Sequence, residues 1–323
     1  MGTKERLRLT VRWMCFALLL TATALRLCAE VGIQGFRQTW ERFRKSDETP
    51  TVLTSEAPTD ATFPTMLYIP PAAGPALTSE DAALVTVINR AGVSFDAEEL
   101  MCRPLPLTCT SDEPLILIVH THASEAYSGG DYVESGAFHT TDPDNNVVAV
   151  GQALADTLNA CGIKTLHDMT LNDVPDYSGA YERTEEVILR YLEEYPSIQM
   201  VIDVHRDAVT DADGAELAMT ASLDGQSAAQ LLFVMGTDAG GLPHPNWQGN
   251  LALAMQLQAY CTKSAPNLFR ELSLRGARYN EHLTPCSVLL EVGAAGNTLD
   301  EAIRSVEFLG ETLAELIQMN SES

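Results

Sequence analysis

Two histidines and a glutamate stand close together directly after an apolar run. In "LILIVHTHASEAY" (115–127) the run ends at Val119, and His120, His122 and Glu125 follow. Imidazole and carboxylate groups are the ligands of catalytic zinc, and two histidines with one carboxylate leave a fourth position for water. These residue types indicate metal-assisted hydrolysis, although each of them alone is more often an ordinary structural residue.

An apolar run that ends in a metal-binding or acid–base side chain occurs twice more. His205 ends the run "VIDVH", and Glu291 ends the run "SVLLE". A carboxylate inside a buried apolar run is costly unless it has a partner. Glu291 is therefore either a general acid and base for an attacking water or one half of a structural ion pair with Arg206 or Arg278.

Apolar runs and amphipathic segments alternate along most of the chain. This alternation predicts an α/β fold with a single, mainly parallel sheet and helices on both faces. If the strands run parallel, His122, His205 and Glu291 meet at the carboxyl edge of the sheet, where α/β proteins bind their ligands. The predicted strands are 115–119, 163–168, 198–205, 231–237 and 287–293, and the predicted helices are 79–92, 146–162, 178–196, 246–264 and 298–319.

The first 30 residues have the pattern of an export signal or a signal-anchor helix. Basic residues up to Arg12 precede the apolar run 13–29, which keeps the basic side in the cytoplasm. We expect a single-pass anchor in the cell membrane with the catalytic domain outside the cytoplasm, and cleavage near Ala29 is the alternative. The expected parts are the anchor (1–30), a juxtamembrane segment and linker (31–79), a short helical lead-in (80–110) and the catalytic domain (111–323).

The composition argues against one class of partner. The 323 residues include 44 acidic and 20 basic side chains, which gives a net charge of −24. Because nucleic-acid phosphates bind Lys and Arg side chains, we expect no nucleic-acid partner.

The seven cysteines include no C-x-x-C pair, which disfavours a zinc knuckle or a thioredoxin-like site. Cys102 and Cys109 are either a disulfide formed outside the cell or two free thiols.

Four longer stretches together resemble a known family. They are "LILIVHTHASEAY", "VIDVHRD", "GTDAGGLPHPNWQGNLALA" and "RYNEHLTPCSVLLEVGAAGNTLDEA". They resemble, in the same order, the signature blocks of the stage II sporulation protein P family of exported, membrane-anchored proteins. The resemblance implies a zinc amidase-like fold and a zinc-dependent N-acetylmuramoyl-L-alanine amidase that also cleaves crosslinks during engulfment. It further implies peptidoglycan as substrate, and the stage II sporulation proteins D and M as partners.

The resemblance also implies a zinc ligand set. His122 stands where related zinc amidases carry their first histidine ligand, and His205 is expected to supply the second. Those enzymes place a glutamate near the start of the following helix, but here that helix opens with Asp144-Asn145-Asn146. Glu125 is therefore the expected third ligand, with Asp144 as the alternative.

Other residues are expected to act on the substrate or on the ligands. Glu291 would accept the proton of water and return it to the leaving amine. His120 would orient a zinc ligand or stabilise the oxyanion. Arg206 would grip a stem-peptide carboxylate through two hydrogen bonds, and its alternative is an ion pair with Asp203 or Asp207.

Asn246 and Trp247 are expected to form a wall for a sugar–peptide substrate, or to serve as a helix cap and a core anchor.

Two rival functions stay open at this point. A peptidase directed mainly at crosslinks would need the same groups. A catalytically silent wall-binding or structural component of a membrane engulfment complex would leave the polar strand ends unexplained.

Overall fold

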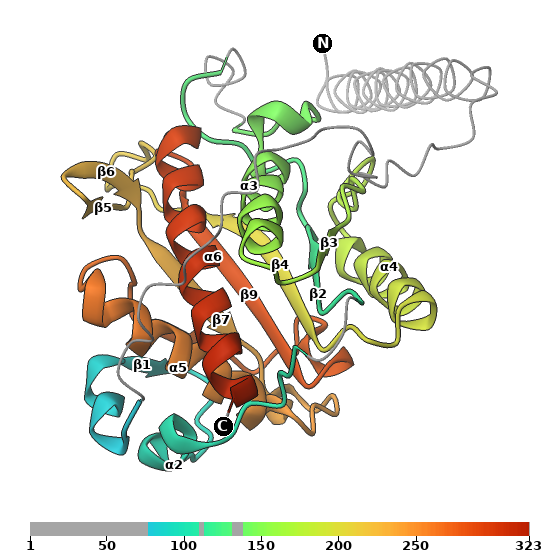
Figure 1. Cartoon of the computed structure of the whole chain (residues 1–323). Helices are drawn as coiled ribbons and strands as arrows, with labels where there is room; N and C mark the ends of the chain where they lie inside the picture. The colour runs from blue at the N-terminus through green and yellow to red at the C-terminus, as the bar shows by residue number, and fades with distance from the viewer. Residues whose placement is uncertain (1–76, 110–112, 131–137, 323) are drawn as a thin grey trace, which may run out of the picture. The chain divides into compact units, whose positions relative to one another are not determined.

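Seven strands form one sheet in the described residues (77–109, 113–130 and 138–322) of the computed structural model (Figure 1). These residues belong to one compact unit, Pro64–Ser323. The sheet has the order β1-β8-β7-β9-β4-β2-β3, and β5 and β6 pair as a separate hairpin. The strands are β1 (Val87–Asn89), β2 (Ile116–Val119), β3 (Thr165–His167), β4 (Met200–Asp207), β5 (Thr220–Leu223), β6 (Gln226–Ala229), β7 (Leu231–Met235), β8 (Leu272–Leu274) and β9 (Cys286–Ala294).

Helices connect most of these strands. The α-helices are α2 (Ala97–Cys102), α3 (Val147–Ala160), α4 (Ala180–Glu194), α5 (Trp247–Ser264) and α6 (Leu299–Glu322), and the short 3₁₀ helices are η1 (Ser79–Leu84), η3 (Pro143–Asn145), η4 (Asp238–Gly240) and η5 (Glu281–Leu283). The expected start of the last helix is confirmed, because Thr298 and Glu301 form a capping box. The Thr298 hydroxyl accepts from the Glu301 amide, and the Glu301 carboxylate accepts from the Thr298 amide.

The direction of the strands divides the sheet into two parts. β3, β2, β4 and β9 run parallel to one another, as the sequence predicts. β7 runs antiparallel to β9, and β8 and β1 run parallel to β7. The sheet is therefore mainly parallel, but the carboxyl ends of β1, β8 and β7 lie at the edge opposite to those of β2, β4 and β9.

One face of the sheet is covered by three helices. Alternate strand residues such as Ile118, Ile202 and Leu290 point into the main core, where they pack with apolar residues of α3, α5 and α6. Figure 1 shows α6 running along this face beside α3. The core is continuous across the strands, so this side of the sheet is a supporting layer.

The other face is covered over only part of its width. Ile188 of α4 packs on Leu117, Val119 and Val201 of β2 and β4. Over β7 and β9 a small cluster of Leu232, Val234 and Leu289 is in contact with the partly buried Tyr279, and no helix of the described chain packs on it. Helices therefore lie on both faces of the sheet, as expected. The face that carries α4 is not covered by a helix of the described chain over β7 and β9.

Several elements differ from the sequence prediction. The helix expected over 79–92 is wrong, because the structure has only the 3₁₀ turn η1 there, followed by β1 at the sheet edge. Thr86, Val87 and Ile88 are β-branched and favour a strand. Helix α2 lies within the expected helical lead-in (80–110), although its bounds were not predicted. The three-residue strand β8 and the β5–β6 hairpin were not predicted, since each is too short to show a clear period.

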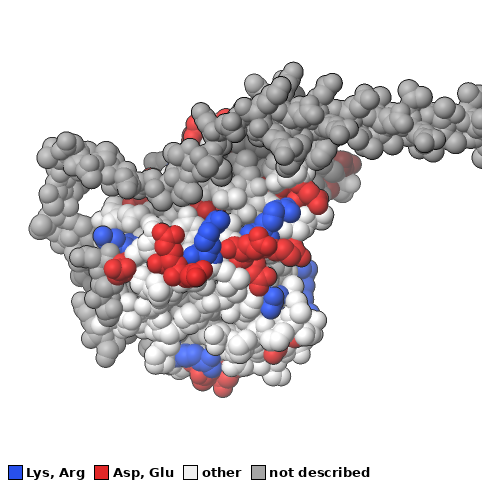
Figure 2. All heavy atoms as spheres, turned by 90° about the vertical axis from the view of Figure 1, so that its right-hand side faces the viewer, with Lys and Arg blue, Asp and Glu red and all other residues white. Residues whose placement is uncertain are grey.

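The predicted anchor and most of the predicted linker lie outside the described residues. Within the described residues no helix is both long and apolar enough to cross a bilayer. Cys102 and Cys109 are free thiols. On the side of the molecule that lies to the right in Figure 1, acidic and basic side chains are interleaved in a band (Figure 2), so the excess of acid is not gathered in one patch there.

Candidate metal centre and active site

His122, Glu125 and His205 converge at the carboxyl edge of the parallel strands. One nitrogen of each imidazole and one carboxylate oxygen all lie within 4.8 Å of one another. Nδ1 of His122 is 3.6 Å from one oxygen of Glu125, and Nδ1 of His205 is 3.4 Å from the other. Two imidazoles and a buried carboxylate at this spacing are a donor set that suits Zn²⁺.

The strands and the turn after β2 determine this geometry. His205 lies near the end of β4, on the face opposite the main core. His122 and Glu125 belong to a turn in which the Glu125 amide donates to the His122 carbonyl at 3.1 Å. The Val147 amide, at the start of α3, then donates to the Glu125 carbonyl at 2.9 Å. The turn is thus tied to a helix end, which holds the carboxylate in place.

The charges of Glu125 and His205 depend on each other. Burial raises the pKa of the Glu125 carboxyl, but hydrogen bonds with His122 and His205 outweigh burial and hold that pKa well below its usual value. Burial lowers the pKa of His205, but the nearby carboxylates of Asp203 and Glu125 raise it well above its usual value. The carboxylates of Glu125 and Asp203 thus favour a positive charge at this position.

Asp203 is a functional candidate that the sequence analysis did not assign to the site. Its Oδ1 lies 3.0 Å from Nε2 of His205, and its carboxylate also accepts from the amide and the hydroxyl of Thr121, at 2.8 and 2.6 Å. A carboxylate behind a ligating histidine fixes the orientation of the ring. The signal was present in "DVH", because residues two apart on a strand point to the same face.

Glu291 lies beside the three-residue cluster. It is the register partner of His205 between β4 and β9, and it is half-buried. Burial and the nearby Glu125 carboxylate raise its pKa to about 8, although His205 opposes this shift. Its Oε2 is buried without a hydrogen-bond partner, and no ion pair involves it in the described chain. The ion pair with Arg206 or Arg278 that the sequence allowed is therefore wrong.

Two tyrosines flank His122. The Tyr177 ring stacks on the imidazole with centroids 4.0 Å apart, and its hydroxyl is 2.9 Å from Nδ1. The Tyr181 ring, from α4, meets the same imidazole edge-on at 5.6 Å. No feature of the sequence identified either tyrosine, because both come from a loop–helix segment that contacts the site only in the folded chain.

The expected role of His120 is wrong. Its side chain points to the opposite face of the sheet, where Nδ1 donates to the Val204 carbonyl at 2.9 Å and Nε2 is 2.8 Å from Nε2 of His167. Burial lowers the pKa of His120 to about 4. Gly151 of α3 passes so close that a Cβ there would meet the His120 ring at 2.5 Å. The reason for the error is strand alternation, which separates residue 120 from the face that carries His205.

The expected role of Arg206 is also wrong. Its guanidinium is buried and donates to the carbonyls of Ala126 and Phe138, at 3.0 and 2.8 Å. Its backbone amide donates to Glu125 Oε2 at 3.1 Å. Arg206 therefore holds the segment that carries Glu125, and its charge is not available to a substrate carboxylate.

Asn246 and Trp247 do not form a wall of this site. They begin α5, which follows the carboxyl end of β7, and β7 is antiparallel to β9. They consequently lie at the edge of the sheet opposite to Glu291. Trp247 packs against the main core, as the alternative interpretation stated, and Asn246 makes no side-chain cap. Asp144, the alternative third ligand, is exposed in η3 and is not part of the cluster.

The fold and the site define a mixed α/β protein with a candidate metal centre at the carboxyl edge of its parallel strands. Residues 53–314 match the profile of the family "Stage II sporulation protein P (SpoIIP)". The chain belongs to this family. Stage II sporulation protein P of Bacillus subtilis (strain 168) is 28% identical over 228 residues, which are 65% of this chain and 53% of that protein. The chain thus spans about half the length of this curated relative.

Solved structures give more distant similarities. The N-acetylmuramoyl-L-alanine amidase AmiC2 of Nostoc punctiforme has 13% identity and a TM-score of 0.38, over 67% of this chain and 100% of that chain. Ami1 of Mycobacterium smegmatis has the same identity and TM-score, over 66% and 99%. The CwlD amidase of Clostridioides difficile, solved with the GerS lipoprotein, has 13% identity and a TM-score of 0.38, over 64% and 98%. At these scores the likeness is too distant to transfer a function.

Proposed function

We propose that the chain is a zinc-dependent peptidoglycan hydrolase of sporulation that cleaves the amide between N-acetylmuramic acid and L-alanine. The observation that carries the proposal is the convergence of His122, Glu125 and His205 beside Glu291. Family membership supports a role in sporulation. A catalytically silent wall-binding protein would have no need for a buried set of two imidazoles and a carboxylate, which costs free energy to assemble.

His122, Glu125 and His205 would hold the Zn²⁺, and Asp203 would fix the ring of His205. When bound, Zn²⁺ would polarise the scissile carbonyl and make a coordinated water more acidic. The residues present fit the ion, because they are the nitrogen and oxygen donors that zinc accepts, and because the carboxylate lies between the two imidazoles.

Glu291 would carry the proton. Hydrolysis joins the oxygen of water to the carbonyl carbon and breaks the C–N bond, so one proton must leave the water and one must reach the leaving amine. This role is supported by the position of Glu291 next to His205 and by its buried oxygen without a hydrogen-bond partner. Tyr177 and Tyr181 would limit access to the edge of His122 and orient the substrate.

A second candidate reaction is cleavage of the peptide crosslink, which needs the same groups. The test is mass spectrometry of the fragments that the full chain releases from purified peptidoglycan, with and without a chelator. Amidase activity releases free stem peptides with an L-alanine amino terminus, whereas crosslink cleavage leaves the peptides on the glycan. Intact peptidoglycan after incubation with the zinc-loaded chain would refute both reactions.

We also propose that residues 1–30 anchor the protein in the cell membrane with residues 111–323 outside the cytoplasm. The support is the basic start followed by the apolar run 13–29. The stage II sporulation proteins D and M remain proposed partners on the basis of family membership. Protease added to protoplasts should digest the carboxyl-terminal part of the chain, and complete protection would contradict this topology.

A further inference from the structure

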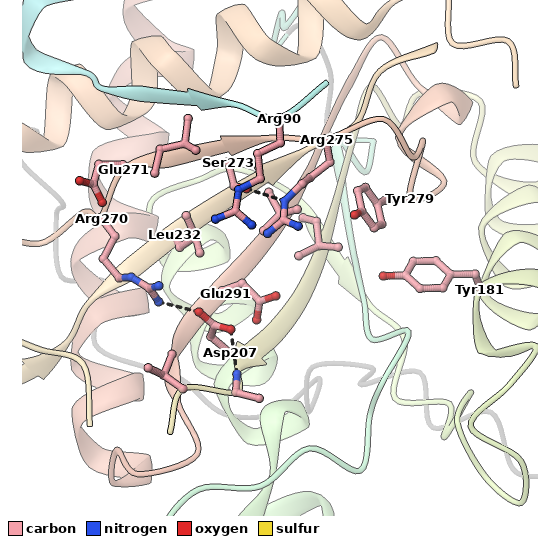
Figure 3. A pocket seen from close by; sticks show the side chains of 15 residues that line it. Arg90, Tyr181, Asp207, Leu232, Arg270, Glu271, Ser273, Arg275, Tyr279 and Glu291 are labelled. Atoms are coloured by element: carbon pink, nitrogen blue, oxygen red, sulfur yellow. Dashed lines mark hydrogen bonds and ion pairs between the residues drawn. The ribbon is translucent and has the colours of Figure 1, made fainter. Parts of the chain in front are cut away.

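The open half of the sheet forms a cleft that begins at Glu291. Its volume is about 370 Å³. The floor is the apolar cluster of Leu232, Val234 and Leu289, and Tyr181 and Tyr279 stand along one side (Figure 3). The cleft therefore continues the candidate active site across β9, β7, β8 and β1.

Three arginines line this cleft in a chain that carries a net charge of −24. They are Arg90, Arg270 and Arg275. Figure 3 shows the side chains of Arg90 and Arg275 reaching over the sheet from β1 and β8, while the carboxylate of Glu271 points away from them. The same lining contains three carboxyl groups, those of Asp207, Glu271 and Glu291, so the evidence for an anionic ligand depends on which arginines have no carboxylate partner.

Arg270 differs from Arg90 and Arg275 because it has a carboxylate partner. Arg270 forms an ion pair with Asp207, at 2.7 Å, so its charge is compensated within the protein. Arg275 donates from Nε to the neutral hydroxyl of Ser273, at 2.7 Å. Among the described residues, no carboxylate pairs with the guanidinium of Arg275 or Arg90.

The two uncompensated guanidinium groups are neighbours. Asn89 and Leu274 are register partners in the parallel pair of β1 and β8, and the Arg90 amide donates to the Leu274 carbonyl at 2.9 Å. Arg90 and Arg275 are the next residues of these strands, and both line the cleft. Two like charges held side by side repel each other, so an anion between them would relieve the repulsion and accept several charge-assisted hydrogen bonds.

The strand register gives the length of the ligand that would span the cleft. When the register of β7 and β8 is continued by one residue, Arg275 is the partner of Gly236, the residue after β7. Continuing the register of β7 and β9 makes Ser287 the partner of Gly236, and Ser287 is four residues before Glu291. This corresponds to about 14 Å along the strands and about 10 Å across two strand spacings. An extended peptide of roughly four or five residues covers the resulting distance of about 17 Å.

We propose that Arg90 and Arg275 bind a carboxylate at the far end of an extended anionic peptide whose near end lies at Glu291. The inference rests on the proposed function, since it assigns this cleft to the peptide part of the wall substrate. The apolar floor and the two tyrosines contact the body of the peptide, and Arg90 and Arg275 bind its free carboxylate. This replaces the role that the sequence suggested for Arg206.

The test is calorimetric titration of the full chain with two synthetic five-residue peptides of identical sequence. One carries free carboxylates, and in the other every carboxylate is converted to an amide. The wild-type chain should bind the free acid about 10- to 100-fold more tightly, which is the size of one or two hydrogen bonds to a charged group. The double variant Arg90→Ala/Arg275→Ala should bind both peptides alike.

The matched control is Arg190→Ala, which removes an exposed arginine of α4 that does not line the cleft. It should keep the full preference for the acid. The melting temperature of the double variant should equal or exceed that of the wild type, because two repelling charges are removed. Arg90→Lys/Arg275→Lys, which keeps the charge without the planar fork, should show an intermediate preference.

Equal binding of the two peptides by the wild type, or a preference that survives in the double variant, would overturn the assignment. These results are independent of the hydrolysis assay. A chain that cleaves peptidoglycan without discriminating between the peptides would keep the proposed function and lose the subsite. A chain that discriminates but cleaves nothing would keep the subsite and lose the function.

Discussion

Oδ1 of Asp203 lies 3.0 Å from Nε2 of His205, on the side of the imidazole opposite to Glu125. The two residues are separated by one position on β4 and point to the same face. A histidine in this setting has one nitrogen held by a carboxylate and the other directed to the candidate metal position. The strand itself thus supplies both the ligand and the group that orients it.

Asp203→Asn should lower the affinity for zinc by about 10- to 100-fold, because the amide cannot hold the His205 ring as a carboxylate does. Activity at saturating zinc should largely return. The measurement is competition with a chromogenic chelator. Thr121→Val is the control, since it removes only a hydroxyl donor from the same carboxylate, and an equal loss of affinity in both variants would argue against an orienting role.

The chain should carry about one Zn²⁺, and Glu125→Ala or His205→Ala should lose it. Asp144→Ala is the matched control, because Asp144 is exposed and outside the cluster; it should keep its zinc. Metal content is measured by mass spectrometry of the purified proteins. Stoichiometric zinc in both His122→Ala and His205→Ala would exclude this site.

Glu291→Gln should reduce turnover by about 10²–10⁴-fold, which is the usual contribution of a general acid or base. Zinc content and melting temperature should stay at the wild-type level, because no ion pair of Glu291 is present in the described chain. Release of soluble fragments from peptidoglycan gives the rate. A fully active, zinc-loaded variant would mean that another group moves the proton.

Arg206→Lys should destabilise the protein without changing its preference for free carboxylates. Lysine cannot donate to the carbonyls of both Ala126 and Phe138 in the planar geometry of arginine. A decrease of roughly 3–8 °C in the melting temperature is expected for the loss of one charged hydrogen bond in a unit of this size. If the variant instead lost its discrimination between acid and amide peptides, Arg206 would be the carboxylate-binding residue.

Glu281 should make the protein less stable at alkaline pH. Burial raises the pKa of this carboxyl well above its usual value, although it accepts from the Gly236 amide at 2.7 Å. The folded chain therefore holds a proton that the unfolded chain has lost, so the stabilisation is complete below the ordinary glutamate pKa. It disappears as the pH rises through the raised pKa of the folded state.

Glu281→Gln stays neutral at every pH and should flatten this dependence. The measurement is the melting temperature of both proteins between pH 5 and pH 9. Glu271→Gln is the control, because Glu271 is exposed. A parallel decrease of the wild type and Glu281→Gln at high pH would show that another group is responsible.

The strands that carry the candidate site could be predicted because their sequences are long apolar runs that end in, or are followed by, a histidine or a glutamate. β2, β4 and β9 were found in this way, and their parallel arrangement places His122, His205 and Glu291 at one edge. The strand ends depend on local pattern, which the sequence contains. The choice of Glu125 depended on the resemblance to zinc amidases, which implies a glutamate ligand, and on the absence of a glutamate near Asp144.

The errors have a different physical origin, which is the direction and pairing of strands in the folded sheet. The sequence of β7 is the same whether the strand runs parallel or antiparallel to β9, so Asn246 and Trp247 were assigned to the wrong edge. Short strands such as β1 and β8 are determined by their neighbours more than by their own residues. The pairing of Arg90 with Arg275 joins positions far apart in the chain, and no local pattern predicts it.

The reversal of β7 relative to β9 also has a practical use. The loop after β7 lies at the edge of the sheet remote from His205, and Leu242 in that loop is 58% exposed. Exposed loop tips tolerate inserted domains. A fluorescent reporter placed between Gly241 and Leu242 would therefore leave the catalytic edge unobstructed, and would allow the protein to be followed in living cells.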